Sequence, residues 1–315
     1  MEITSATTSK LSSSVPTFEC VNTLDFKTTV YALATLNQSR FAVGGGAREG
    51  SEVAIWDTAG TPYNPPPEVE TITSLASADN GSSLITGGMR AFSDHGGYLK
   101  VWPLGSTAPS YNKQLESVVS SLASHPNNRW IVTGDWDGVI KIWDRSSPDS
   151  QPFNFPNKEG YVNALAFVQN GDYLTSGHSK NIHVQEMKHY TYLSPYIGHT
   201  DAVLALSDMG NGILASGSAD KTIKIWDTTK PSNQAFVKTL PIIHKDAVFA
   251  LARWSDTILV SGSADSSFVV WDITTGDYWQ CPQAHEGAVK ALTVCNNMLI
   301  TGSFDKSVKI WQPKN

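Results

Sequence analysis

The sequence predicts an all-β fold in which seven repeated four-stranded antiparallel sheets form a closed ring. The first observation is a near-copy: SGSAD at 216–220 precedes IKIWD at 223–227, and the pattern returns at 261–272 and 301–311. The second is a set of weaker copies upstream, so that the repeated anchor falls at residues 56, 102, 143, 185, 226, 271 and 311. The third is the period, roughly forty residues, which is typical of repeated small sheets.

The best-preserved unit, residues 199–240, has the pattern of four short strands. Its predicted strands are residues 202–206, 213–218, 222–226 and 235–240. Gly210-Asn211-Gly212 and Ala219-Asp220-Lys221 supply turns between them, and no segment of the unit has a helical period. Each unit is therefore expected to form one antiparallel sheet.

An isolated four-stranded sheet cannot bury both of its faces. Neighbouring sheets must stack face to face, and a closed ring leaves no exposed end sheet. This arrangement is the β-propeller, and seven units nearly fill the 315-residue chain.

Ring closure needs one further strand, because the last unit ends near Trp311 after three strands. Residues 17–24 have strand character and no sheet of their own, so we expect them to pair with the last unit. Residues 16–315 are then one domain. Residues 1–15 are rich in Ser and Thr and are expected to be a disordered tail.

The pair Gly198-His199, the Ser218/Asp220 pair and Trp226-Asp227 resemble the WD40 repeat family. The resemblance spans roughly residues 17–313 and is strongest in the last three units. It implies a seven-bladed WD40 β-propeller whose ends are joined by the N-terminal strand. It also implies a hydrogen-bonded tetrad of His, Ser, Asp and Trp in each well-preserved unit.

The expected tetrads are His199, Ser218, Asp220 and Trp226; His244, Ser263, Asp265 and Trp271; and His285, Ser303, Asp305 and Trp311. The third unit keeps Asp137 and Trp143, with Asp135 at the expected Ser position. The fourth keeps none of the four residue types in place and has Gln185 where Trp is expected. The third and fourth sheets are therefore expected to be held less tightly.

Because the tetrads contain His, Ser and Asp, a catalytic triad has to be weighed. A serine hydrolase needs one nucleophile at an exposed, strained position beside an oxyanion hole. Here the same set recurs three times at structural spacing, which favours a structural role. The sequence thus predicts no catalytic residue.

Function is then expected in surface recognition. The resemblance implies that partners dock on the rim, meaning the face of the ring that carries the tetrad turns. Aromatic side chains often anchor protein interfaces. The alternative is that the aromatic side chains of the rim pack against neighbouring loops. The rim residues predicted to bind a partner are Tyr31, Arg90, Phe92, His95, Trp136, Tyr161, Asn163, Phe249, Lys290 and Phe304. Arg90, Phe92 and His95 belong to a lengthened turn in the second unit, and residues 47–51 lengthen the first.

Composition narrows the function classes. The formal net charge is −6 without long runs of one sign, which does not indicate a nucleic-acid surface. No apolar stretch is long enough to span a membrane, and the N-terminus lacks the features of a secretory signal. Three widely spaced cysteines suggest reduced thiols. We expect a cytoplasmic protein, with the nucleus as an alternative.

No metal or cofactor is predicted. The glycine run at 44–50 precedes a strand, whereas a phosphate-binding loop needs a following helix. His285-Glu286 lacks the second His of a zinc-protease motif. The leading expectation is a non-enzymatic scaffold or adaptor, monomeric within a larger complex, that binds a protein or peptide. The alternatives are a substrate-recognition subunit of a ubiquitin-ligase-type complex, a carbohydrate-binding propeller and, last, an enzyme using the central funnel.

Overall fold

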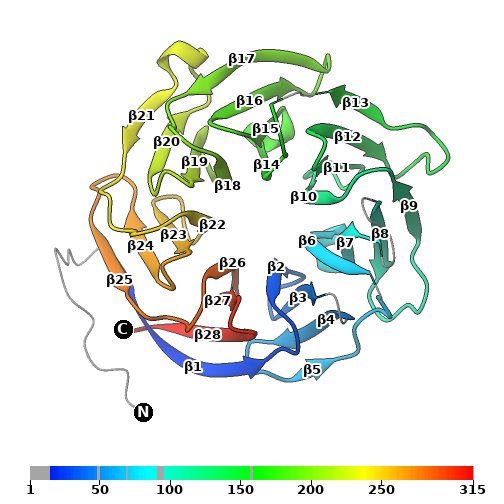
Figure 1. The fold of residues 1–315 in the computed structure, drawn as a ribbon, viewed down its shortest axis with the longest axis horizontal. Helices are drawn as coiled ribbons and strands as arrows, with labels where there is room; N and C mark the ends of the chain where they lie inside the picture. Colours follow the sequence, from blue (N-terminus) through cyan, green and yellow to red (C-terminus); the bar gives the residue numbers. More distant parts are fainter. Residues whose placement is uncertain (1–14, 48–49, 69, 91–95, 157–158, 315) are drawn as a thin grey trace.

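The computed structural model describes residues 15–314 except 48, 49, 69, 91–95, 157 and 158. Seven four-stranded antiparallel sheets stand around a central axis and form a ring (Figure 1). The first strand of each sheet lies at the centre and the last at the perimeter. The predicted seven-bladed propeller is confirmed.

The first three sheets are β2 (Val30–Thr35), β3 (Arg40–Ala47), β4 (Gly50–Asp57) and β5 (Pro62–Tyr63); β6 (Thr71–Ala78), β7 (Ser83–Met89), β8 (Gly97–Pro103) and β9 (Tyr111–Leu115); and β10 (Val119–Ser124), β11 (Trp130–Asp135), β12 (Val139–Asp144) and β13 (Phe153–Pro156). The next two are β14 (Ala164–Val168), β15 (Tyr173–Gly177), β16 (Asn181–Glu186) and β17 (Thr191–Ile197); and β18 (Val203–Gly210), β19 (Ile213–Ser218), β20 (Ile223–Asp227) and β21 (Phe236–Thr239). The last two are β22 (Val248–Arg253), β23 (Ile258–Ser263), β24 (Phe268–Asp272) and β25 (Tyr278–Cys281); and β26 (Val289–Cys295), β27 (Met298–Ser303), β28 (Ser307–Lys314) and β1 (Thr17–Asp25).

Three 3-10 turns complete the regular structure: η1 (Asp79–Gly81), η2 (Gln169–Gly171) and η3 (Ser232–Gln234). No helix in the described ranges is long and apolar enough to cross a membrane.

The hydrophobic core lies between the sheets. Ile223 and Ile225 of β20, for example, share a buried cluster with Leu259 and Val269 of the next sheet. The middle strands are buried on both faces for this reason; every residue of β23 is buried. Each sheet is therefore stabilised by two neighbours rather than by a core of its own.

A glycine in the second strand of every sheet lets the next sheet approach closely. A Cβ atom on Gly262 would lie 2.6 Å from a methyl of Val289, on the inner strand of the following sheet. Gly217 faces Val248 in the same way, also at 2.6 Å. The other five positions are Gly44, Gly87, Gly134, Gly177 and Gly302. The branched side chain of one sheet thus fills the space that the missing Cβ of the other leaves.

The N-terminal strand closes the ring as predicted. β1 pairs antiparallel with β28 from Thr17 opposite Lys314 to Asp25 opposite Ser307, with one bulge after Cys20. Immediately afterwards the chain enters the first sheet, where Val30 packs on Gly302 of the last sheet. The two ends of the chain are therefore held in one sheet.

The start of the domain lies at or before Val15. This residue, which the sequence placed in the tail, is buried in the same cluster as Phe18 and Trp311. The rest of the predicted tail, residues 1–14, lies outside the described residues.

Deleting residues 1–25 should destabilise the whole ring. The deletion removes the buried Phe18 and Val15 and all pairing to β28, a loss of about 5 kcal/mol or more. We expect a fall in the melting temperature and an aggregation-prone edge at β28, measured by circular dichroism and size-exclusion chromatography. Deletion of residues 1–14 alone is the control and should leave melting unchanged; equal melting of both variants would contradict the closure.

The glycine packing gives a second prediction. Gly262→Ala should cost about 1–3 kcal/mol, because the new methyl overlaps Val289. Combining it with Val289→Ala should destabilise by less than the sum of the single changes, since the second change removes the clash. Chemical denaturation of the four proteins measures this coupling. Strict additivity would show that the contact does not limit packing.

Candidate functional site

Three hydrogen-bonded tetrads pin the rim of the last three sheets. In the fifth sheet, the Trp226 indole donates to Ser216 Oγ at 2.8 Å, and His199 Nε2 lies 2.8 Å from the same oxygen. His199 Nδ1 is 2.8 Å from Asp220 Oδ2. The set ties the loop entering β18 to the β19–β20 turn and to the third strand.

The other two tetrads repeat this geometry. Their hydroxyls belong to Ser261, between His244 and Trp271, and to Thr301, between His285 and Trp311. The carboxyl partners are Asp265 and Asp305.

The sequence assignment of the tetrad hydroxyls to Ser218, Ser263 and Ser303 is wrong. Ser218 instead donates to the Asp201 carbonyl and accepts from the Asp220 amide, so it shapes the turn. Ser263 does the same with Asp246 and Asp265, and Ser303 accepts from the Asp305 amide. Residues two apart share a strand face, so strand alternation could not separate Ser216 from Ser218. The strand register does: Trp226 pairs with Leu214, which brings its indole to Ser216.

In every sheet except the first, a Ser or Thr stands at the position of the tetrad hydroxyl. Trp143 donates to Thr133, and Trp102 donates to Thr86. In the first sheet Val43 stands at the position of the tetrad hydroxyl. The strand register identifies it, since Phe41 pairs with Trp56 as Leu214 pairs with Trp226. There Trp56 packs against Phe26 and Phe41 instead.

The second and fourth sheets replace the tetrad histidine. In the second, Glu68 accepts from Thr86 at 3.0 Å and forms a buried ion pair with Lys100 at 2.7 Å. In the fourth, Ser176 is reached by Gln185 and by His178, which arrives from the following turn. Sequence reasoning missed both substitutes, because Glu68 stands at the His position but is of another residue type, and His178 stands in a turn position that holds no tetrad residue in the last three sheets. The third sheet lacks this link, and Asp137 is exposed.

Burial and hydrogen bonding set the charges of the tetrads. Burial lowers the pKa of His199 and of His285. Burial also opposes ionisation of Asp220, but hydrogen bonds from Thr222, the Thr200 amide and His199 outweigh it and lower its pKa to about 2. The pKa values of Asp265 and Asp305 are lowered by similar bonds against the same opposing burial.

The tetrads do not have the geometry of a nucleophilic site. Ser216, Ser261 and Thr301 have no exposed surface, so a substrate cannot reach their hydroxyls. Each hydroxyl is also engaged by both an indole and an imidazole. This arrangement holds the rim turns rigid.

Two groups of aromatic side chains lie on the rim. Trp136, in the β11–β12 turn, stacks on Tyr161, with ring centroids 5.7 Å apart. They are 39% and 58% exposed, which is high for aromatic residues. We call them the aromatic pair.

The second group, the aromatic cluster, consists of Tyr31, Phe249, Phe304 and Lys290. Phe304 is 41% exposed and meets Tyr31 at 5.8 Å and Phe249 at 6.4 Å between ring centroids. Its members come from the sixth, seventh and first sheets. The pair and the cluster thus stand on opposite sides of the central opening, beside β10 and β14 and beside β22, β26 and β2 (Figure 1).

Two other predicted rim residues, Arg90 and Asn163, have hydrogen-bond partners outside these groups. Arg90 donates to Gln114 on the perimeter strand β9, and Asn163 donates to the His178 carbonyl. Phe92 and His95 lie outside the described residues. The sequence therefore gave no information on which of the predicted rim side chains touch one another.

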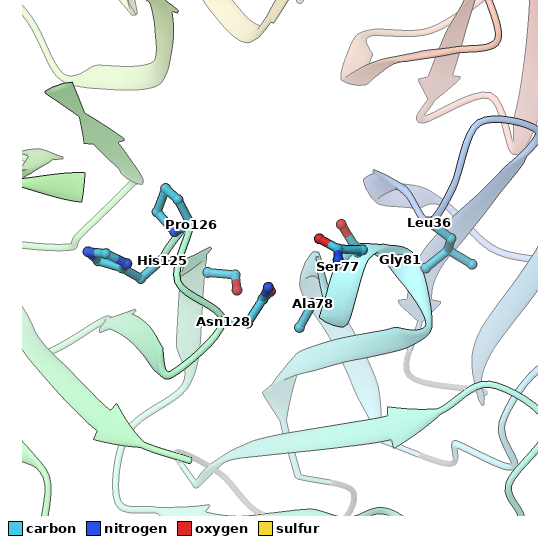
Figure 2. Close-up of a pocket in the computed structure, with 9 residues that line it drawn as sticks. Leu36, Ser77, Ala78, Gly81, His125, Pro126 and Asn128 are labelled. Atoms are coloured by element: carbon cyan, nitrogen blue, oxygen red, sulfur yellow. The ribbon is translucent and has the colours of Figure 1, made fainter. Parts of the chain in front are cut away.

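The opposite face carries a pocket of about 280 Å³. It is formed by the first turns of three sheets, with Leu36 on one side and His125 and Pro126 on the other (Figure 2). Its polar groups already make structural contacts: Asn128 accepts from the Asp79 amide, and His125 lies 3.2 Å from the Gly171 carbonyl. Asp79 also pairs with Arg145 at 2.7 Å. No group of three or more potential metal ligands occurs among the residues described.

Family comparison agrees with this geometry. The sequence matches the family described as "WD domain, G-beta repeat" (WD40) over residues 110–144, 150–184, 190–227, 235–272 and 278–312. The chain belongs to the WD40 family. The matched segments end with the third strands of the third to seventh sheets.

Similar proteins include the nuclear distribution protein PAC1 of Candida albicans, 28% identical over 134 residues, which are 40% of this chain and 26% of that protein. The target of rapamycin complex subunit wat1 of Schizosaccharomyces pombe is 27% identical over 168 residues, 50% of this chain and 51% of that protein. Human striatin-4 is 33% identical over 147 residues, 39% of this chain and 19% of that protein. The chain thus matches at most about half the length of these relatives.

Replacing one tetrad carboxylate should lower stability. Asp220→Asn removes the charged acceptor of His199 and of two turn donors, at a cost of about 1–3 kcal/mol. Asp137→Asn is the matched control, because it occupies the same place in the third sheet but is exposed. Urea denaturation should show a lower midpoint for the first variant only. Equal midpoints would contradict a structural tetrad.

The same pair of proteins predicts a pH dependence. The pKa of Asp220 in the fold, about 2, lies below its ordinary value of 3.8. Its stabilisation is therefore complete above pH 3.8 and is lost as the pH falls toward 2. The stability gap between wild type and Asp220→Asn should shrink as the pH falls from 4 toward 2. A gap that widens over this range would refute the assignment.

Proposed function

We propose that this protein is a non-enzymatic scaffold that docks a protein or peptide partner on the rim. The observation that carries the proposal is the grouping of exposed aromatic side chains there, above all Trp136, Tyr161 and Phe304. Large aromatic residues held in fixed positions are typical anchors of protein interfaces.

The rigidity of the rim supports the same proposal. The tetrads of the sixth and seventh sheets fix the β23–β24 turn and the β27–β28 turn, which carries Phe304, so binding orders few protein groups. A relative, wat1, is named as a subunit of a complex, which fits a scaffold role. The tetrad hydroxyls are buried, which supports a structural role for them rather than a catalytic one.

The test is comparative affinity capture from cell extract. The bait is wild type beside a triple variant, Trp136→Ala, Tyr161→Ala and Phe304→Ala. The control is Phe153→Ala, Tyr192→Ala and Phe236→Ala, which removes three aromatics of similar exposure, 45%, 43% and 49%, from the perimeter strands. Melting curves confirm that all three baits are folded.

We expect the rim variant to lose a defined set of proteins, each by about tenfold or more, that the perimeter variant keeps. Recovery of the same proteins by all three baits would reject docking on the rim. Loss from the perimeter variant alone would move the docking surface to the side of the ring.

A further inference from the structure

The half-buried Lys290 side chain lies against an aromatic ring at the rim end of an inner strand. Its Nζ lies 4.3 Å from the ring centroid of Phe249. Phe304 links that ring to Tyr31, and the inner strands that carry Phe249, Lys290 and Tyr31 are neighbours around the axis. One ammonium group thus stands at the edge of a cluster of aromatic side chains.

This ammonium lacks an anionic partner among the residues described. Lys290 forms no hydrogen bond or ion pair with them, and burial lowers its pKa. Two other half-buried lysines have a polar partner: Lys100 contacts Glu68 at 2.7 Å, and Lys309 contacts the Ala284 carbonyl at 2.6 Å. A partly buried cation without a counter-charge loses part of its hydration, and the ring of Phe249 offsets this only in part.

We propose that the aromatic cluster is a site for a carboxylate side chain, Asp or Glu, of an extended partner segment. The carboxylate forms an ion pair with Lys290, and the rings of Tyr31, Phe249 and Phe304 contact apolar side chains beside it. This inference rests on the proposed docking at the rim and specifies the chemistry of its partner.

A carboxylate fits better than other charged groups. Phosphate recognition usually uses clustered arginines with several donors, and the cluster contains one lysine and no arginine. A basic partner side chain would be repelled, because Lys290 already occupies the face of Phe249.

Three pools of capped nine-residue peptides test the site. The flanking positions are the same random mixture of apolar and aromatic residues, and the central residue is Glu, Gln or Lys. Wild type should retain the Glu pool about tenfold more than the Gln pool, the difference between a charge-assisted and a neutral contact. Lys290→Met should abolish this preference, and Lys290→Glu should reverse it in favour of the Lys pool.

Two further variants keep the test specific. Lys290→Arg retains the charge and should retain the preference for Glu. Lys245→Met removes an exposed lysine beside the tetrad of the sixth sheet and should change nothing. Melting curves establish folding of each variant, so a misfolded Lys290→Glu leaves the Met and Arg variants to decide.

The outcomes separate this inference from the proposed function. Equal retention of the Glu and Gln pools, lost in the Trp136, Tyr161 and Phe304 variant, would overturn the carboxylate site and keep docking on the rim. Failure of every pool to bind wild type would also overturn the carboxylate site, while the capture experiment decides independently whether the rim docks a partner.

Discussion

The pairing of β1 with β28 is the constraint on which the rest of the structure depends. Each sheet is buried by its two neighbours, so an open ring would leave two sheets with an exposed apolar face. β1 supplies the perimeter strand of the last sheet, and Val30 then packs on Gly302 across the closing interface. The first and last sheets gain their second neighbour only when this joint is made. The stability of the ring is therefore a property of the closed chain.

Within the closed ring, one hydroxyl position links packing to the shape of the rim. It receives the indole of the third strand and, in the last three sheets, an imidazole that reaches a turn aspartate. Where the histidine is replaced, a different buried group takes over, such as Glu68 with Lys100. Sheets six and seven, which have complete tetrads, carry most of the aromatic cluster. The aromatic pair stands on the third and fourth sheets, where the hydrogen bonds to this hydroxyl differ from those of a tetrad.

Much of the fold was predictable from the sequence, because the same strand pattern recurs in seven units and each copy predicts the same sheet. The closing strand was also predictable. The last unit has only three strands of its own, and the strand at the N-terminal end has no sheet of its own, so the two are expected to pair. The tetrad serines were not: Ser216 and Ser218 share a face, and only the register between β19 and β20 separates them. Glu68 and His178 escaped for another reason: Glu68 is not the residue type expected at its position, and His178 reaches Ser176 from the turn that follows the second strand. The aromatic cluster beside Lys290 is assembled from three sheets at once, which no local pattern encodes.

Native-state hydrogen exchange of the backbone amides of β1 and β28 tests the account most directly. If ring closure holds the fold together, these amides exchange only through global unfolding, with the same free energy of opening as those of the central strands β19 and β23. Exchange of β1 by local opening, while β19 and β23 stay fully protected, would contradict it and show that the sheets are stable without the joint.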